Sequence, residues 1–349
     1  TAEDAPREGK EIGRRVKMTG LLELKERIAR FYGKYEIYIT PIIRFVVAFA
    51  AFMTINAKVG YMSSLNSTPV VLILALVCAL LPVNATLVLA TILILAHLYA
   101  LSLEVCLVGA ILFLLLYFFY FRFAPKDGYG TVLTSLGFAF RVPYVMPLAM
   151  GLLREVYAVL SLVCGTIVYF FLDGIRTNQA LLGEGTEDQE SSKITIVLNR
   201  LLDNKEMFLV LGIMAITMIL VYLIRRLAIE NAWTVAIISG VLFQTIGLIA
   251  GYMLLGISGK TVEILVGNVI GCAIAFILQF LFFHLDYSRT ERLQFEDDDY
   301  YYYVKAVPKV CVSGSDKKIK RFSAREDERE RLTKKQFAQE MDIDEELLD

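Results

Sequence analysis

Nine apolar runs, each close to the length of a membrane-spanning helix, constrain this chain more than any other feature of its sequence. A helix needs about 20 apolar residues to cross about 30 Å of hydrocarbon, and its backbone groups must pair internally. Only 25 of the 71 charged side chains fall within residues 38–284. The sequence therefore predicts an all-α polytopic membrane protein, and it excludes a nucleic-acid-binding domain, a secreted disulfide scaffold and a disordered chain. The runs lie near residues 38–57, 68–83, 85–103, 105–123, 131–150, 155–173, 206–224, 232–256 and 262–284.

The distribution of charge divides the chain into three parts. Residues 1–37 are predicted to carry a basic amphipathic helix on the cytoplasmic face, because apolar residues from Leu21 to Tyr35 recur at three- and four-residue steps among lysines and arginines. This helix suits anionic lipid, and docking of a partner protein is the alternative. Residues 38–284 form the predicted transmembrane domain, and residues 285–349 form a charged cytoplasmic tail. With no cleavable signal peptide expected, the first span is predicted to direct insertion.

Basic residues next to the spans predict the orientation of the chain. They precede the first span, follow the seventh as Arg225 and Arg226, and recur in the tail, which places all three regions in the cytoplasm. Nine full crossings cannot leave both ends on one side. We therefore expect about eight transmembrane helices and one run that does not cross.

The run at residues 131–150 is the best candidate for the exception. Arg141, Pro143 and Pro147 all lie in its second half. Each proline removes a backbone donor, and an arginine at the bilayer centre is costly. We predict a re-entrant or Pro-broken segment. The alternative is a single Pro-kinked crossing whose arginine reaches an interface.

The last spans and the preceding loop carry further patterns. Gly247/Gly251 and Gly267/Gly271 are small-xxx-small pairs, which predict a tight pairing of the last two spans or a contact between copies of the chain. Residues 174–205 are predicted to be an external loop. Its segment KITIVLNRLL, residues 193–202, has one apolar helical face and is expected to lie on the outer membrane surface.

A few polar side chains within the apolar runs are candidates for a substrate pathway. His97 could bind a proton or a substrate, and the alternative is a packed, hydrogen-bonded imidazole with a structural role. Gln244 and Asn268 are amides of the kind that also tie helices together. With no HExxH motif, Walker A loop or paired intramembrane aspartates, we expect no enzyme activity, no metal and no cofactor. The candidate pathway residues are Arg141, Pro143, Pro147, His97, Asn268 and Gln244.

The tail contains an unusual run of acids and tyrosines. Four tyrosines with a β-branched flank favour an extended strand, which is too short to fold alone. It is predicted to pair with a partner's sheet edge, a second copy or the chain's own loops. The alternative is a flexible acidic linker whose tyrosines rest in the membrane interface. The candidate partner-binding residues are Glu296, Asp297, Asp298, Asp299, Tyr300, Tyr301, Tyr302 and Tyr303.

The whole chain resembles an uncharacterised bacterial family of polytopic membrane proteins. The resemblance implies a bacterial inner membrane, and it implies no activity or substrate. It rests on the segments LPVN (81–84), AHLYALSLE (96–104), YFRFAPKD (120–127), RVPYVMPLAMGLL (141–153) and QFEDDDYYYYVKAVPK (294–309).

Two functional hypotheses follow. The first is a solute transporter or the permease subunit of a transport complex, in which the broken segment lines a cavity and Arg141 attracts an anionic group. The second is a non-transporting membrane scaffold for envelope assembly, which recruits a cytoplasmic protein through its tyrosine-rich tail.

Overall fold

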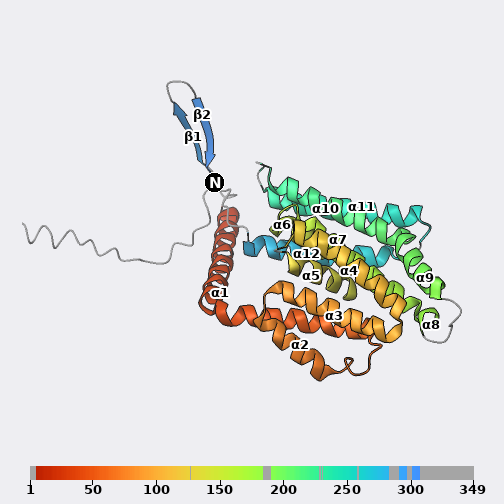
Figure 1. Cartoon of the computed structure of the whole chain (residues 1–349). Helices are drawn as coiled ribbons and strands as arrows, with labels where there is room; N and C mark the ends of the chain where they lie inside the picture. The colour runs from red at the N-terminus through yellow and green to blue at the C-terminus, as the bar shows by residue number, and fades with distance from the viewer. Residues whose placement is uncertain are drawn as a thin grey trace, which may run out of the picture. The chain divides into compact units, whose positions relative to one another are not determined.

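The chain folds into a bundle of helices followed by a short β-hairpin (Figure 1). The computed structural model describes residues 5–125, 127–183, 190–227, 229, 231–257, 259–282, 291–296 and 301–306, and the side chains of residues 24–282 within these ranges except 190–192. The elements are α1 (Ala5–Val59), α2 (Thr68–Leu80), α3 (Val83–Leu101), α4 (Leu103–Phe123), α5 (Gly128–Ala139), α6 (Val145–Leu153), α7 (Ala158–Thr177), α8 (Gln179–Leu182), α9 (Glu190–Leu202), α10 (Lys205–Arg225), α11 (Ala232–Leu254), α12 (Thr261–Phe282), β1 (Glu291–Glu296) and β2 (Tyr301–Ala306).

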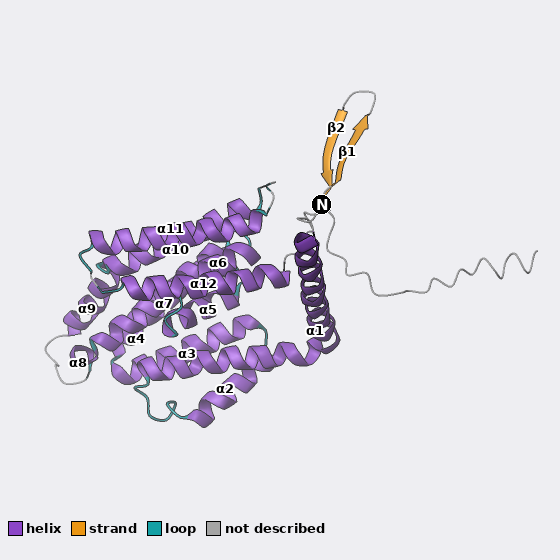
Figure 2. Cartoon of the chain, turned by 180° about the vertical axis from the view of Figure 1, so that it is seen from behind, coloured by secondary structure: helices purple, strands orange, loops and turns teal. Residues whose placement is uncertain are grey.

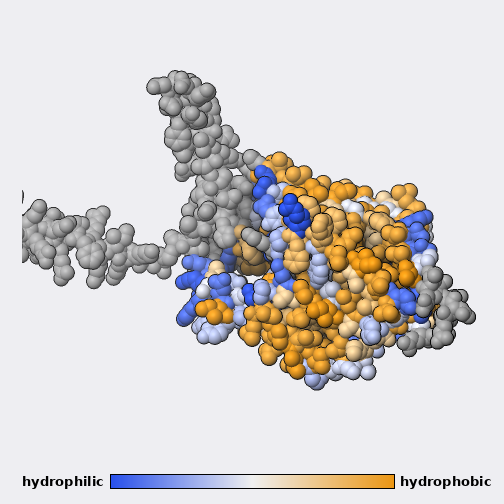
Figure 3. Space-filling model, in the orientation of Figure 1, coloured by the Kyte–Doolittle hydropathy of each residue, from blue (hydrophilic) through white to orange (hydrophobic). Residues whose placement is uncertain are grey.

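Seven helices among the described residues are long and apolar enough to cross a membrane. Six of them are α1 from Leu24 on, α3, α4, α7, α11 and α12. The seventh is the stretch Lys193–Arg225, which contains α10. The helix α2 is equally apolar but has 13 residues, which is about 20 Å at the usual rise per residue. In Figure 3, apolar side chains cover the middle of the visible face of the bundle and hydrophilic ones gather mostly toward the helix ends.

The first helix joins the predicted amphipathic segment to the first predicted span. Its helical backbone is interrupted at Tyr35, whose φ of −113° and ψ of 17° bend α1 (Figure 1). Beyond the bend, Arg44 donates from Nη1 to the carbonyl oxygen of Leu81 at 3.2 Å. Its guanidinium therefore caps the end of α2 at the turn before α3, a contact that local sequence does not indicate.

The predicted interruption within residues 131–150 lies between α5 and α6. Arg141 takes a left-handed conformation with φ of 61°. The N–H of Arg141 donates to Phe138 O at 3.1 Å and the N–H of Val142 donates to Gly137 O at 2.8 Å. These two bonds form a Schellman motif, which pairs the last carbonyls of α5 and stops the helix. Pro143, which has no N–H, follows directly and cannot continue it.

The chain reverses direction at this interruption. Arg154 Nε, just after α6, lies 3.4 Å from Oδ1 of Asp127, just before α5. A straight helix from residue 127 to residue 154 would separate them by about 40 Å, so a kinked crossing does not fit. Thr134 Oγ1 lies 4.0 Å from Met150 Sδ, as expected for an antiparallel pair. We call α5 and α6 together the helical hairpin.

The loop expected at residues 174–205 is largely helical, and its apolar face is not on the outer surface. Val197 is buried, and Ile194 and Leu201 pack in the same apolar cluster as residues of α4 and α7. Leu198, expected on that face, remains exposed. The prediction of a surface-lying helix is wrong because α4 and α7 supply a protein surface for these side chains.

The two glycine pairs do not bring α11 and α12 together. A side chain at Gly251 would meet Leu209 of α10, and Gly247 likewise faces Ile213. In α12, Gly267 lies against the ring of Tyr144 from the helical hairpin. The last two spans do pack against each other, as predicted. These glycines do not form that contact, because they face α10 and the helical hairpin instead.

The tail forms two antiparallel strands within the described residues (Figure 2). Glu291 pairs with Ala306, and Glu296 pairs with Tyr301. Tyr301, Tyr302 and Tyr303 thus pair with Glu296, Phe295 and Gln294 of the same chain. The residues Asp297, Asp298, Asp299 and Tyr300 and the tail beyond Ala306 lie outside the described residues.

Docking of the helical hairpin against α12 is tested by Gly267→Ala. The new methyl group overlaps the ring of buried Tyr144, so we expect a loss of about 1–3 kcal/mol in stability from overpacking. The control is Gly212→Ala in α10, where nothing lies within 4 Å of the added atom. Thermal unfolding in detergent should show a lower Tm for Gly267→Ala and an equal or higher Tm for Gly212→Ala. Equal responses of both variants would contradict this packing.

Candidate functional site

A small cavity lies between five helices of the bundle. Its volume is about 90 Å³, which is less than the ~150 Å³ of an engineered apolar cavity that binds benzene. The space can therefore enclose only a small group or part of a larger ligand. Its walls are formed by Ala51, Thr54, Ile55 and Lys58 of α1, Leu87, Ala90, Thr91 and Ile94 of α3, Phe113, Leu116, Tyr117 and Tyr120 of α4, Thr131, Val132, Ser135 and Leu136 of α5, and Cys164, Val168, Tyr169 and Leu172 of α7.

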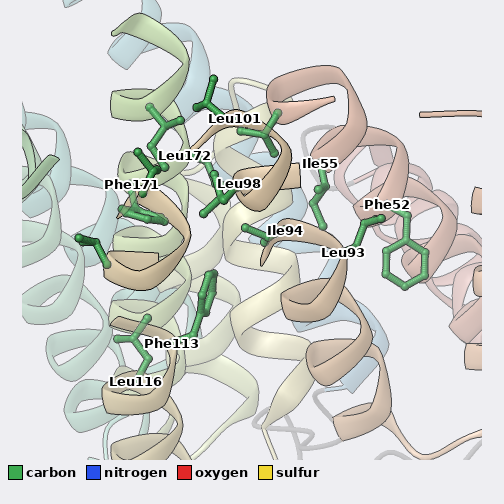
Figure 4. Close-up of a cluster of buried hydrophobic side chains, with 14 of the residues drawn as sticks. Phe52, Ile55, Leu93, Ile94, Leu98, Leu101, Phe113, Leu116, Phe171 and Leu172 are labelled. Atoms are coloured by element: carbon green, nitrogen blue, oxygen red, sulfur yellow. The ribbon is translucent and has the colours of Figure 1, made fainter. Parts of the chain in front are cut away.

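Apolar packing holds four of these helices, α1, α3, α4 and α7, together. Ile55, Ile94 and Leu172 come from α1, α3 and α7 and gather in one buried cluster with Phe113 of α4 (Figure 4). The ring of Phe113 meets that of Phe171 edge to face, with centroids 6.3 Å apart. The helical hairpin closes the cavity, because α5 contributes the fifth wall.

Most hydroxyl groups in the wall are already paired. Thr91 Oγ1 and Tyr117 OH both donate to Leu87 O, at 3.0 and 2.9 Å. Ser135 Oγ donates to Gly165 O at 2.9 Å. A hydroxyl bound to the backbone offers little to a polar ligand, so these residues leave an effectively apolar surface. Among the wall residues only Thr131 has a buried hydroxyl without a partner in the described part of the chain.

One charged side chain, Lys58, lines the cavity. Its side chain is 11% exposed, and Nζ lies 3.0 Å from Oδ1 of Asp173. The same ammonium lies 3.7 Å from the ring centroid of Tyr169, a cation–π distance. Asp173 is 47% exposed. The lysine thus stands between an apolar interior and a carboxylate that solvent reaches.

The base of the helical hairpin is the second polar centre. Asp127 is 1% exposed, and its Oδ2 has no hydrogen-bond partner among the described residues. Burial raises the pKa of Asp127, and the nearby Arg154 guanidinium partly opposes this. Arg225 of α10 donates to Leu152 O and, at 2.6 Å, to Arg154 O. These bonds pair carbonyls at the end of α6, because the last carbonyls of a helix have no hydrogen-bond donor within the helix itself.

A further ion pair extends this base network. Glu155 accepts from Tyr222 OH at 2.7 Å and from Arg226 Nη2 at 3.1 Å. Both donors belong to the end of α10 and the residue after it, so the junction between α6 and α7 is fixed to one end of that helix.

The predicted pathway residues divide between separate places. Pro143 lies in the turn of the hairpin, and Pro147 lies in the first turn of α6, where a missing N–H costs no helical bond. Gln244 Nε2 donates to Tyr144 O at 3.4 Å. The buried amide oxygens of Gln244 and Asn268 have no partner among the described residues. Arg141 is exposed at the turn.

His97 has a structural environment. Its Nδ1 accepts from the backbone N–H of Met62 at 3.1 Å, so the proton of a neutral ring lies on Nε2. That nitrogen lies 2.9 Å from Asn56 Oδ1, which accepts the bond. The side chain is 0% exposed, and it links α3 to α1 and to the loop that follows α1.

None of the six predicted pathway residues lines the cavity. Sequence reasoning missed Lys58, Asp127 and Asp173 as partners in specific ion pairs, because each lies near a span end where charge is ordinary. The spacing of polar residues within the apolar runs could have indicated the cavity lining. Thr131 and Ser135 are four residues apart, as are Thr54 and Lys58, and this spacing places each pair on one helical face.

Comparisons with known protein families, with characterised proteins and with solved structures find no match. Within the described residues, no group of three or more His, Cys, Asp or Glu side chains is arranged to hold a metal ion. The apolar helices define the chain as an integral, multi-pass membrane protein.

The burial of Asp127 predicts a pH-dependent stability. Because its folded pKa is raised, its contribution is fully present below the unfolded pKa and is lost as pH rises through the folded pKa. The Asp127→Asn variant cannot ionise and keeps its stability. We therefore expect the Tm of Asp127→Asn minus that of the natural chain to increase from pH 4 to pH 8.

Arg154→Gln serves as the control for this prediction, since it removes the charge that opposes the rise in pKa. Its Tm relative to the natural chain should fall over the same pH range. If the Asp127→Asn difference instead decreases with pH, pairing with Arg154 outweighs burial and the assigned direction is wrong.

Proposed function

We propose that this protein is a membrane transporter, or the permease subunit of a transport complex, and acts by binding and moving a solute rather than by catalysis. The observation that carries this proposal is the helical hairpin inside the bundle, with α5 forming one wall of the cavity. Irregular backbone at membrane depth is tolerated where protein buries it or where it lines a cavity. Many carriers build their substrate sites from such interrupted helices.

The position of the helical hairpin would allow it to transmit movement of the last three helices to the cavity. Its α5 packs against α3 and α7, while α6 packs against α10, α11 and α12. The hairpin therefore lies between the helices that surround the cavity and the last three helices. A small shift of α10 to α12 would reach the cavity through α6 and α5. The ion pair Asp127–Arg154 at the base and the bond from Gln244 to Tyr144 O would hold the resting position.

We propose eight crossings with both termini on the cytoplasmic side of a bacterial inner membrane. The contacts at one end of the bundle support this topology. Arg44 reaches Leu81 O, and Asn84 Nδ2 donates to Pro125 O at 3.0 Å. Arg225 reaches Arg154 O. These arginines mark the cytoplasmic side by the positive-inside rule, and α2 counts as a short crossing.

The scaffold hypothesis has one observation in its favour. The strands β1 and β2 pair only with each other among the described residues. Each keeps one edge with unpaired backbone groups, and such an edge accepts a strand from another chain. A cytoplasmic protein that adds a strand to this hairpin would make the tail a recruitment site, with or without transport by the helical part.

A solute pathway is tested with two single-cysteine forms, one retaining Cys164 and the other Cys78. Both thiols are almost fully buried, but only Cys164 lines the cavity. We expect a small membrane-impermeant thiol reagent to label Cys164 in right-side-out or inside-out vesicles and to leave Cys78 unlabelled. Equal protection of both thiols from both sides would mean a sealed cavity and would reject a transport pathway.

The topology is tested with reporter fusions at Lys126, at Gln189 and at the C-terminus. Eight crossings place the first and third on the cytoplasmic side, because the hairpin returns the chain to the side from which it entered. The fusion at Gln189 should report the opposite side. A C-terminal reporter on the same side as Gln189 would contradict the parity of the crossings.

A further inference from the structure

The cavity and the ion pair at Lys58 together indicate a class of ligand. We propose that the cavity binds the part of the alkyl chain nearest the headgroup of an anionic amphiphile and that Lys58 binds its phosphate or carboxylate headgroup. This inference rests on the proposed function, since it names the substrate class of the same cavity. It follows from the shape of the space, from the pairing of its hydroxyls and from the position of one ammonium.

The lining of the cavity extends along two of its helices. On α1 the lining residues run from Ala51 to Lys58, and on α4 from Phe113 to Tyr120. Each stretch is about 10 Å long at the rise per residue of a helix. The lining thus extends along the helix axes. Because the wall hydroxyls of Thr91, Tyr117 and Ser135 already donate to carbonyl oxygens, an alkyl chain loses no hydrogen bond by entering.

The charge at one end of the cavity selects an anion. Lys58 is the only charged residue of the lining, and its single carboxylate partner, Asp173, is about half exposed. An incoming anion can replace that carboxylate while water solvates the released Asp173. An ammonium without an anion would be costly in this setting, so exchange of one anion for another is the favoured event.

A second positive group lies at the same end. Arg176 is exposed one helical turn beyond Asp173 on α7. Burial raises the pKa of the Tyr61 hydroxyl and the charge of Arg176 opposes this, which places Arg176 close to the loop after α1. The Tyr61 hydroxyl is buried and has no partner among the described residues. A headgroup at Lys58 would find this donor and this guanidinium nearby.

The chain contains a matched control for Lys58. Lys260 is also paired with a carboxylate, that of Glu206. Its Nζ lies 5.3 Å from the ring centroid of Tyr252. The arrangement repeats the lysine, carboxylate and tyrosine of the proposed site, but Lys260 does not line the cavity. A loss of binding that is specific to Lys58 therefore cannot be ascribed to removal of any lysine ion pair.

The test measures equilibrium binding of radiolabelled octyl phosphate to the full chain in nanodiscs of phosphatidylcholine. Octyl glucoside and octyltrimethylammonium serve as neutral and cationic probes with the same alkyl chain. We expect Lys58→Met to weaken octyl phosphate binding at least tenfold and Lys260→Met to leave it unchanged. Asp173→Asn should strengthen it several-fold, because a competing carboxylate is removed. Neither Lys58→Met nor Asp173→Asn should alter binding of the neutral probe.

Opposite effects of Lys58→Met and Asp173→Asn distinguish a ligand site from a structural ion pair. If both variants weaken octyl phosphate binding equally, or if Lys260→Met matches Lys58→Met, the proposal is wrong. Should Lys58→Met fail to fold, Lys58→Arg keeps the cation and must keep the preference for octyl phosphate over octyl glucoside. Loss of that preference in a folded Lys58→Arg protein, together with no gain in Asp173→Asn, also rejects the site.

The anion can come from the membrane or from solution. Nanodiscs containing phosphatidylglycerol separate these sources, since displacement of octyl phosphate identifies a membrane lipid as the ligand and retention identifies a free amphiphile. Either result supports the headgroup site. Failure here is also separable from failure of the proposed function. Octyl phosphate binding without labelling of Cys164 would reject the transport pathway alone, and labelling without Lys58-dependent binding would reject this ligand class alone.

Discussion

A polypeptide that stops being helical inside an apolar bundle must find a partner for each backbone group that the helix no longer pairs. The helical hairpin meets this requirement at both of its ends. At the turn, the N–H of Val142 returns to α5, Pro143 has no N–H to pair, and Gln244 reaches Tyr144 O. At the base, Arg225 donates to carbonyls that end α6. The rest of the structure depends on this pairing, because without it the chain could not reverse among apolar helices.

The reversal divides the bundle into two packing environments. On one side, α5 approaches α7 so closely that Ser135 bonds to Gly165 O, and the cavity lies along this side. On the other side, Leu148 and Leu152 of α6 join a buried cluster with residues of α10 and α11. Polar contacts are concentrated at the helix ends, where a charge such as Lys58 stays near water. Asp127 is the most deeply buried charged side chain among the described residues, and it lies at the base that holds the hairpin closed.

The sequence predicted the apolar spans. It also predicted an interruption within residues 131–150 and a packed, hydrogen-bonded His97, each as one of two alternatives. These properties depend on neighbouring residues, since hydropathy and proline act locally. It did not predict the cavity. Its lining comes from five helices, and the pairs Lys58–Asp173 and Asp127–Arg154 join residues far apart in the chain. The glycine pairs show the same limit, because a small residue permits close approach without naming the helix that approaches.

By itself, the sequence determined that the chain is a multi-pass membrane protein and identified residues 131–150 as the run least like an ordinary span. Apolar length is sufficient for the first conclusion, and the arginine and two prolines in one run indicate the second. Only the tertiary structure decided that this segment folds back on itself, that α9 packs against α4 and α7, and that one lysine faces an apolar cavity. The reason is physical: in an apolar solvent nearly every helix face can be buried equally well, so the choice among partners depends on shape and on a few ion pairs between distant residues.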